Sequence, residues 1–190
     1  MKKELDTYTK LLNSALELFR KKGYSATGIN EIVAQSGAPK GCLYHYFPGG
    51  KEEIAIKVVK AYEKAESNKI KRILSSSPDP VKAFELIFEE FIEKISRGGE
   101  FENLSITLLS LESINISESL RKACASAFES LETLFTERLV ESGFKEEIAK
   151  ERARILLCLF NGALTLSLSQ KNISHLLLAK KEIRSILFYY

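Results

Sequence analysis

The chain has 190 residues, of which 45% are hydrophobic and 28% carry a charge, and its formal net charge is +3. This apolar content is enough to bury a core, which excludes a disordered tail, and no stretch approaches the roughly 18 consecutive apolar residues of a membrane span. The three cysteines are widely spaced, so neither a disulfide framework nor a zinc ribbon is indicated, and we expect a reducing cytoplasm.

Four helices are predicted in the first part of the chain. Apolar residues recur at helical spacing over 8–22, and a glycine follows. Thr27 is a suitable N-cap for a second helix, which we expect to end near residue 36. A short third helix is predicted over 39–47, because proline is well tolerated in a first helical turn. A long fourth helix is predicted over 51–74.

Further helices are predicted beyond the Ser- and Pro-rich break at 75–80. Their expected ranges are 81–96, 101–111, 117–141, 146–170 and 174–189. No run of Val, Ile and Thr alternates with the period of a strand. The sequence therefore predicts an all-α protein of about nine helices, with an N-terminal three-helix helix-turn-helix domain and a C-terminal helical lobe.

The second and third helices, with the first packed across them, are typical of a helix-turn-helix unit. In that motif the second helix of the pair enters the major groove of DNA. Lys40 can reach a guanine edge or a phosphate, whereas Tyr44, His45 and Tyr46 are too many polar-tipped rings for one small core. The first 72 residues hold 14 basic and 8 acidic side chains, which favours a polyanionic partner.

Two apolar residues and one lysine also fit the helix-turn-helix interpretation. Leu43 and Phe47 are four positions apart, so they are the better candidates for the buried face of the third helix. Lys51 lies at the start of the fourth helix, where free backbone N–H groups attract anions, and it could hold a phosphate there.

The segment from about Leu11 to Ala55 resembles the DNA-binding domain of the TetR family of bacterial transcriptional repressors. The resemblance rests on the stretch ALELFRKKGYSATGINEIVAQSGAPKGCLYHYFPGGKEEIA. Its GAPKG.LYHYFP.GKEE portion looks most like the branch of lincomycin-resistance-type repressors, which sense drugs or plant flavonoids. The match covers about a quarter of the chain, and the all-helical remainder is consistent with the variable sensor domain of that family.

The resemblance also implies roles for individual residues in DNA binding. By position, phosphate contacts are implied for Thr27, Tyr46 and Lys51. Contacts with base edges or the adjacent backbone are implied for Lys40, Gly41, Tyr44 and His45. Cys42 departs from the small hydroxyl residue that family members usually place there, so its own phosphate contact is not implied.

The segment 155–168 is apolar nearly all round, so we expect it to be covered on more than one side. Together with the last helix it would form a self-complementary four-helix interface across a two-fold axis, and the resemblance implies the same two helices. The residues predicted for this homodimer interface are Leu156, Leu159, Phe160, Ala163, Leu176 and Ile183.

Phenylalanines and small polar residues are interspersed in the helices between these two regions. An apolar cavity with a few polar groups is the usual site for a small organic ligand. The residues predicted to line it are Phe84, Phe88, Phe91, Phe101, Ser105, Leu108, Phe128, Phe135 and Asn161. The alternative is that phenylalanines at helical spacing are ordinary core residues.

The sequence is therefore interpreted as a DNA-binding repressor and not as an enzyme. Residues 1–50 are assigned to the DNA-binding domain and 51–190 to effector binding and dimerisation, with the helix over 51–74 connecting them. The expected partners are double-stranded operator DNA with a pseudo-palindromic site, a small hydrophobic or aromatic effector that releases it, and a second copy of the chain. No cofactor, metal or membrane is expected. The alternatives are a helical adaptor or enzyme that retains the N-terminal fold, an activator, or a redox-gated repressor.

Overall fold

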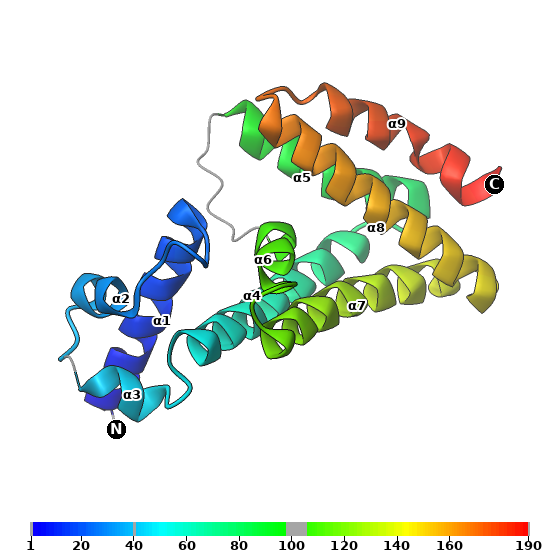
Figure 1. Ribbon diagram of the computed structural model, residues 1–190. Coiled ribbons are helices and arrows are strands. Elements are labelled where there is room, and N and C mark those ends of the chain that lie inside the picture. The colour runs from blue at the N-terminus through cyan, green and yellow to red at the C-terminus, as the bar shows by residue number, and fades with distance from the viewer. Residues whose placement is uncertain (1, 40, 98–105, 190) are drawn as a thin grey trace. The chain divides into compact units, whose positions relative to one another are not determined.

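The computed structural model describes residues 2–39, 41–97 and 106–189, with side chains from residue 6 onward. These residues form nine α-helices and no strand, so the predicted all-α fold is confirmed (Figure 1). None of the described helices is both long and apolar enough to cross a membrane. The helices are α1 (Lys2–Lys22), α2 (Ile29–Ser36), α3 (Cys42–Tyr46), α4 (Gly50–Leu74), α5 (Pro80–Ser96), α6 (Ile106–Ser113), α7 (Glu118–Glu141), α8 (Glu146–Ser169) and α9 (Ser174–Phe188).

Two helices, α1 and α3, begin at least three residues away from the start that the sequence predicts. α1 starts at Lys2 because its polar first turns are helical although they carry no apolar repeat. α3 starts at Cys42, with Gly41 as its N-cap, and the Cys42 N–H donates to the Pro39 carbonyl over 2.9 Å. Pro39 therefore precedes the helix instead of lying in its first turn. The expected start of the sixth helix, at 101–105, lies outside the described residues.

The chain divides into two compact units. Unit 1 comprises residues 1–64 and 102–127, and unit 2 comprises 65–101 and 128–190. The long helices α4 and α7 each contribute one part to unit 1 and the other to unit 2. The predicted functional boundary at residue 50 does not coincide with this division, because α6 packs with the N-terminal helices.

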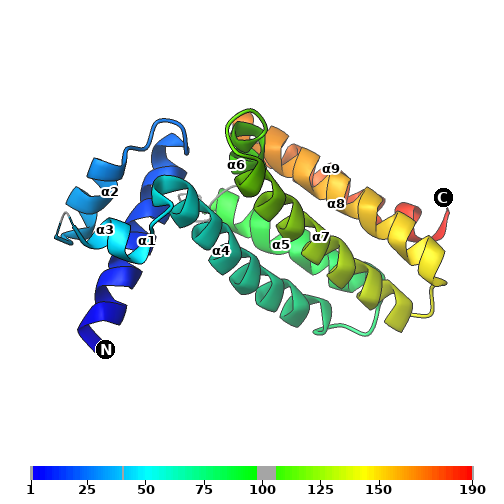
Figure 2. The same cartoon turned by 60° about the horizontal axis from the view of Figure 1, so that its bottom comes forward.

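In unit 1, α1 packs against α2 and α3 (Figure 2). Leu11, Ala15 and Phe19 recur every four residues along one face of α1, and all three are buried. Leu43 and Phe47 are also buried, which confirms the predicted inner face of α3. The third helix is thus held by two apolar anchors, and its Tyr44 and His45 side chains are exposed.

In unit 2, α9 packs against α5 and α8. The three helices lie side by side in Figure 1. Their apolar residues form one core cluster, to which α7 adds Phe135 and Leu139. The rings of Phe84 and Phe135 meet edge to face with centroids 5.0 Å apart. Aromatic rings therefore fill the centre of this unit.

Candidate nucleic-acid interface

The turn between α1 and α2 is built on a glycine and a buried threonine. Gly23 has a φ of 83°, a left-handed conformation that favours glycine at a helix C-terminus. The Thr27 hydroxyl donates to the Gly23 carbonyl over 2.7 Å, and the side chain is only 2% exposed. The N-cap of α2 is Gly28, so the predicted capping role of Thr27 is wrong. Its hydroxyl closes the turn instead.

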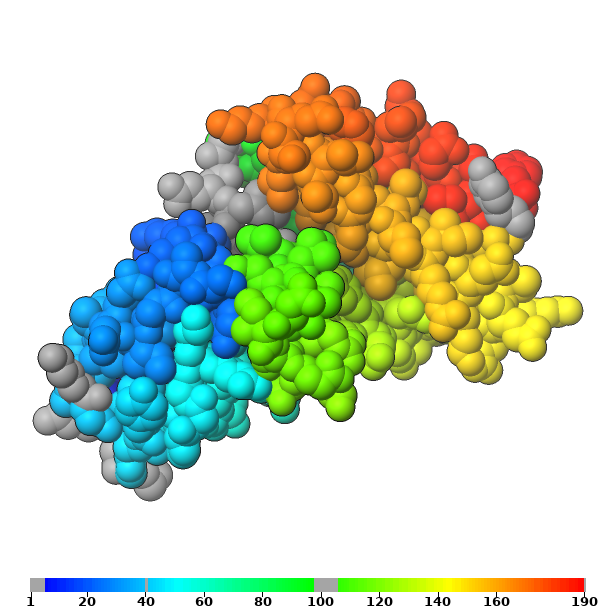
Figure 3. Space-filling model, in the orientation of Figure 1, coloured from blue at the N-terminus to red at the C-terminus, as the bar shows by residue number. Residues whose placement is uncertain are grey.

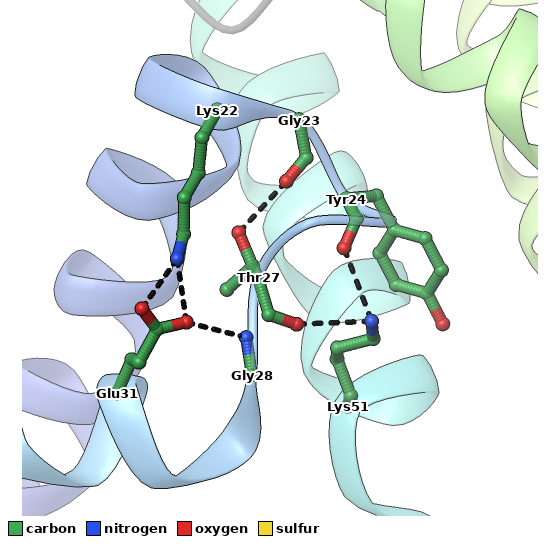
Figure 4. A network of polar contacts seen from close by, with 7 residues as sticks. All are labelled: Lys22, Gly23, Tyr24, Thr27, Gly28, Glu31 and Lys51. Carbon is green, nitrogen blue, oxygen red and sulfur yellow. Dashed lines mark hydrogen bonds and ion pairs between the residues drawn. The ribbon is translucent and has the colours of Figure 1, made fainter.

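Glu31 stabilises the start of α2 from within the helix (Figure 4). Its carboxylate accepts a hydrogen bond from the Gly28 N–H over 2.8 Å, which satisfies a donor that the helix itself cannot. The same carboxylate binds the Lys22 ammonium at the end of α1. The hydrogen bond from Lys22, followed by that from Gly28, lowers the pKa of Glu31 below its ordinary value. The end of α1 and the start of α2 are therefore joined through one side chain.

Lys51 binds the same turn from the first turn of α4. Its ammonium donates to the carbonyls of Tyr24 and Thr27 over 3.1 and 3.0 Å, and lies 4.3 Å from the centre of the Tyr24 ring (Figure 4). An ammonium has three N–H donors, and these contacts use two of them. The phosphate contact predicted for Lys51 remains a prediction, and it would have to use the third donor.

The exposed side of α3 carries the polar-tipped rings that the sequence singles out. Tyr44 is 57% exposed, and His45 is exposed beside it. Gly41 is exposed as well, while Lys40 lies outside the described residues. Cys42 is half-buried. Among the described side chains of α3, those of Tyr44 and His45 are therefore the exposed ones.

Tyr46 is half-buried and belongs to an aromatic group that joins α3 to α1. Tyr8 stacks on Phe47 with centroids 5.0 Å apart, and its edge meets Tyr46 at 6.1 Å. His45 meets the Tyr46 ring edge to face at 5.0 Å. Such contacts orient the rings, since aromatic pairs favour these geometries. The phosphate contact predicted for Tyr46 remains a prediction.

A carboxylate far away in the sequence also contacts the turn after α1. Glu112, in the last turn of α6, accepts hydrogen bonds from the N–H groups of Tyr24 and Ser25 over 2.8 and 3.2 Å. All of these residues belong to unit 1. The contact of Glu112 with this turn could not be predicted from the sequence, because no local pattern relates residues that are 88 positions apart.

The described residues among those predicted to line a ligand cavity are divided between the two units, and the cavity itself remains a prediction. Phe84, Phe88, Phe91 and Phe135 are buried in the core cluster of unit 2. Leu108 belongs to unit 1 and is 50% exposed. Phe128 and Asn161 are half-buried, and the Asn161 amide donates to the Leu157 carbonyl over 2.9 Å; Phe101 and Ser105 lie outside the described residues.

A different set of residues lines a cavity of about 350 Å³ in unit 2, between α7 and α8. They are Glu132, Thr133, Thr136, Glu137, Val140, Glu146, Lys150 and Arg154. None belongs to the predicted set. In the part of the chain that the structure describes, no group of three His, Cys, Asp or Glu side chains could hold a metal ion.

Most residues predicted for the dimer interface are buried within the single chain. Leu156, Ala163, Leu176 and Ile183 are core residues of unit 2, and Leu159 and Phe160 are half-buried. A helix that is apolar all round does not show in its sequence which face its own chain covers. The large apolar residues that are exposed on α8 and α9 are others. One is Ile148, in the first turn of α8, and we call the remaining four the exposed seam: Leu166, Leu177, Leu178 and Phe188.

The sequence matches two family models that together cover most of its length. Residues 11–58 match the model of bacterial regulatory proteins of the tetR family, and residues 80–182 match the C-terminal domain of LmrA/YxaF-like transcriptional regulators. The chain is 39% identical over 178 residues to the HTH-type transcriptional regulator YxaF of Bacillus subtilis, covering 94% of this chain and 93% of that one. It is 36% identical over 172 residues to the regulator LmrA of the same organism, covering 90% and 92%.

Solved structures have the same fold at lower identity. A TetR transcriptional regulator from Chloroflexus aurantiacus superimposes with a TM-score of 0.82 at 19% identity, covering 100% of this chain and 98% of that one. The reduced form of NemR from E. coli gives a TM-score of 0.79 at 21% identity, with 95% and 97% covered. These likenesses concern the fold, and the sequence matches establish the kinship. The chain belongs to the TetR family of helix-turn-helix transcriptional regulators, in the branch that has an LmrA/YxaF-like C-terminal domain.

Proposed function

We propose that this regulator is a repressor that binds a pseudo-palindromic operator as a homodimer and is released by a small hydrophobic effector. The observation that carries the proposal is the division of α3 into two sides. Leu43 and Phe47 are buried, whereas Tyr44 and His45 are exposed. A short helix anchored in this way presents its polar rings to base edges in a major groove.

Two copies are needed for a pseudo-palindromic site, because two recognition helices about 34 Å apart read successive major grooves. We propose that the exposed seam on α8 and α9 is the contact between the copies. Large apolar side chains that remain exposed on neighbouring helices favour burial against another surface. Residues 1–50 would then serve as the DNA-binding domain and 51–190 as the effector and dimerisation domain. A regulator of this kind acts where DNA is, so we propose a cytoplasmic location.

The effector is proposed to bind in unit 2, beside the aromatic cluster. Phe160 on α8 meets Phe88 and Phe91 on α5 edge to face, with centroids 5.2 and 4.9 Å apart. Phe160 is the half-buried member of this group, so solvent reaches the cluster through it. A small aromatic molecule could displace the Phe160 ring and contact Phe88 and Phe91 in its place. Its binding would favour a dimer whose recognition helices are wrongly spaced for the operator.

The test of the DNA-binding part uses the full chain and a randomised duplex library. We expect selection to enrich one pseudo-palindromic sequence, with an affinity that falls steeply as salt rises, because phosphate contacts release counterions. Duplexes from the DNA upstream of its own gene are then compared with a scrambled duplex of equal composition. An adaptor or enzyme that only retains the fold would enrich no sequence, and that result would overturn the proposal.

The test of the effector part uses a library of small aromatic compounds. Compounds that bind the folded chain raise its melting temperature. We expect some of these to weaken binding to the selected duplex, since a coupling between two sites acts in both directions. If compounds raise the melting temperature but leave the dissociation constant of the duplex unchanged, release by an effector is wrong.

A further inference from the structure

The contact between Glu112 and the turn after α1 links the two regions that the family models distinguish. Tyr24 and Ser25 lie in the part that matches the tetR-family model, whereas Glu112 lies in the part that matches the C-terminal domain. Both oxygens of the carboxylate are used, one for each N–H group. Figure 3 shows the α6 segment, in green, against the blue and cyan segments of unit 1.

The turn is shaped to accept this carboxylate. A Cβ atom on Gly23 would lie 2.9 Å from Glu112 Oε1, which is closer than real Cβ atoms approach. Glycine is favoured at this position by its positive φ, and a side chain there would push the Glu112 carboxylate away from its present place. Hydrogen bonds to a charged group are also stronger than those between neutral groups.

The position of Glu112 is unfavourable within its own helix. It lies in the last turn of α6, where the helix dipole disfavours a negative charge, and no basic residue occupies that turn. The N–H groups of Tyr24 and Ser25 offset this cost. The charge therefore serves a contact with the N-terminal helices and not the stability of α6.

The same turn is also bound by Lys51. The ammonium binds two carbonyls of the turn, and the Glu112 carboxylate binds two of its N–H groups. Burial, followed by the negative charges of Glu52 and Glu112, raises the pKa of Tyr24. Another contact within unit 1 joins the segment between α6 and α7 to α4, since the Ser117 hydroxyl donates to Glu52 over 2.6 Å.

We propose that Glu112 is a positioning residue for DNA binding, which fixes the turn between α1 and α2 from α6. This turn sets the direction in which α2 leaves α1, and α2 in turn places α3. Glu112 touches no DNA itself. The inference rests on the proposed function, because a selected duplex is needed to detect it.

The experiment compares the wild type with E112A, E112Q and E118A. Glu118 is a matched control, because it is an exposed glutamate of unit 1 that pairs only with Arg121 and Lys122 of its own helix. Binding is measured on the selected duplex and on a scrambled duplex at several salt concentrations. We expect E112A to weaken binding to the selected duplex about tenfold, a typical coupling between sites. Binding to the scrambled duplex and the salt slope should not change, because no phosphate contact is lost.

E112Q keeps an oxygen acceptor and should recover part of the loss, while E118A should behave as the wild type. If E112A binds the selected duplex as the wild type does, Glu112 does not position the turn. If E112A loses affinity equally for both duplexes, it only damages the fold, and the proposal is wrong in that case too. If E112A does not fold, E112D replaces it in the same comparison of the selected and scrambled duplexes. E112D keeps the charge, but its side chain is one methylene shorter. A wild type that prefers no duplex would instead refute the proposed function.

Discussion

Arg138 of α7 donates a hydrogen bond from Nε to the main-chain oxygen of Leu74, the last residue of α4, over 3.0 Å. Its Nη2 donates to the carbonyls of Ser77 and Pro78 over 2.8 and 2.9 Å, and its Nη1 binds the Ser142 hydroxyl. The side chain is buried. One guanidinium therefore donates hydrogen bonds to a carbonyl at the end of α4 and to two carbonyls of the connection that follows it. The last carbonyls of a helix have no partner within the helix.

Replacing Arg138 by Ala should lower the free energy of unfolding by about 2 to 4 kcal/mol, because buried carbonyls lose a charged donor. Chemical denaturation monitored by circular dichroism measures this change. Arg184→Ala is the control, since Arg184 lies exposed on α9. Equal stability of the two variants would show that the Arg138 contacts contribute nothing.

The hydroxyl of Thr27 is predicted to stabilise the turn without contributing to the salt dependence of DNA binding. Thr27→Val keeps the shape of the side chain but leaves the Gly23 carbonyl without its donor, so stability should fall by about 1 to 2 kcal/mol. The slope of log K against log salt should stay the same. A slope reduced by about one would instead reveal a phosphate contact.

Tyr44 should determine sequence choice, because its ring is the most exposed aromatic side chain on α3. We expect Tyr44→Phe to weaken binding to the selected duplex about three- to tenfold, the value of one hydrogen bond, and to leave the scrambled duplex unaffected. Tyr189→Phe, at the exposed end of the chain, is the control. If Tyr44→Phe weakens binding to both duplexes alike, the residue does not read bases.

The helices and the inner face of α3 could be predicted from the sequence because their signals are local. The spacing of Leu43 and Phe47 indicates a buried face, and both residues are buried. Thr27 was expected to cap α2 because its type favours that position, but a sequence does not show which acceptor a hydroxyl chooses. No residue near Glu112 in the sequence indicates its contact, because its partner Tyr24 lies 88 positions away.

The residues of the proposed interface on α8 could not be predicted one by one for a different reason. The helix is apolar on every side, so Leu156 and Leu166 look equally suitable in the sequence. In the folded chain Leu156 is buried and Leu166 is exposed, because α5 and α9 cover one side only. Which leucine of α8 is buried depends on where the neighbouring helices pack, and not on the residue type.

The exposed seam provides the prediction on oligomeric state. Leu178 on α9 is 62% exposed, and Leu178→Asp should weaken the dimer by at least about tenfold, because a charge would be buried in an apolar contact. Sedimentation equilibrium measures the dissociation constant. Leu111→Asp, at an equally exposed leucine of α6, should leave it unchanged. The seam is not the interface if Leu111→Asp has the larger effect.

The cysteines provide a prediction on reactivity. Burial raises the pKa of the Cys124 thiol from 9.0 to about 11, whereas Cys158 is exposed on α8. At pH 8 Cys124 should react with iodoacetamide much more slowly than the exposed Cys158, because the thiolate is the nucleophile and a pKa of about 11 leaves Cys124 with about 100-fold less thiolate than a pKa of 9.0 would. Mass spectrometry of the labelled peptides distinguishes the sites, and equal rates would contradict the burial of Cys124.

The same thiol should make stability depend on pH in the alkaline range. The folded state keeps Cys124 protonated up to about pH 11, whereas the unfolded chain releases this proton near its ordinary pKa of 9.0. The contribution is therefore complete below about pH 9 and is lost as the pH rises towards 11. The free energy of unfolding of the wild type should fall more steeply between pH 8.5 and about 10.5 than that of Cys124→Ala, which has no thiol to titrate. Cys158→Ala, which removes an exposed thiol instead of a buried one, should follow the wild type. Parallel curves for the wild type and Cys124→Ala would refute the linkage.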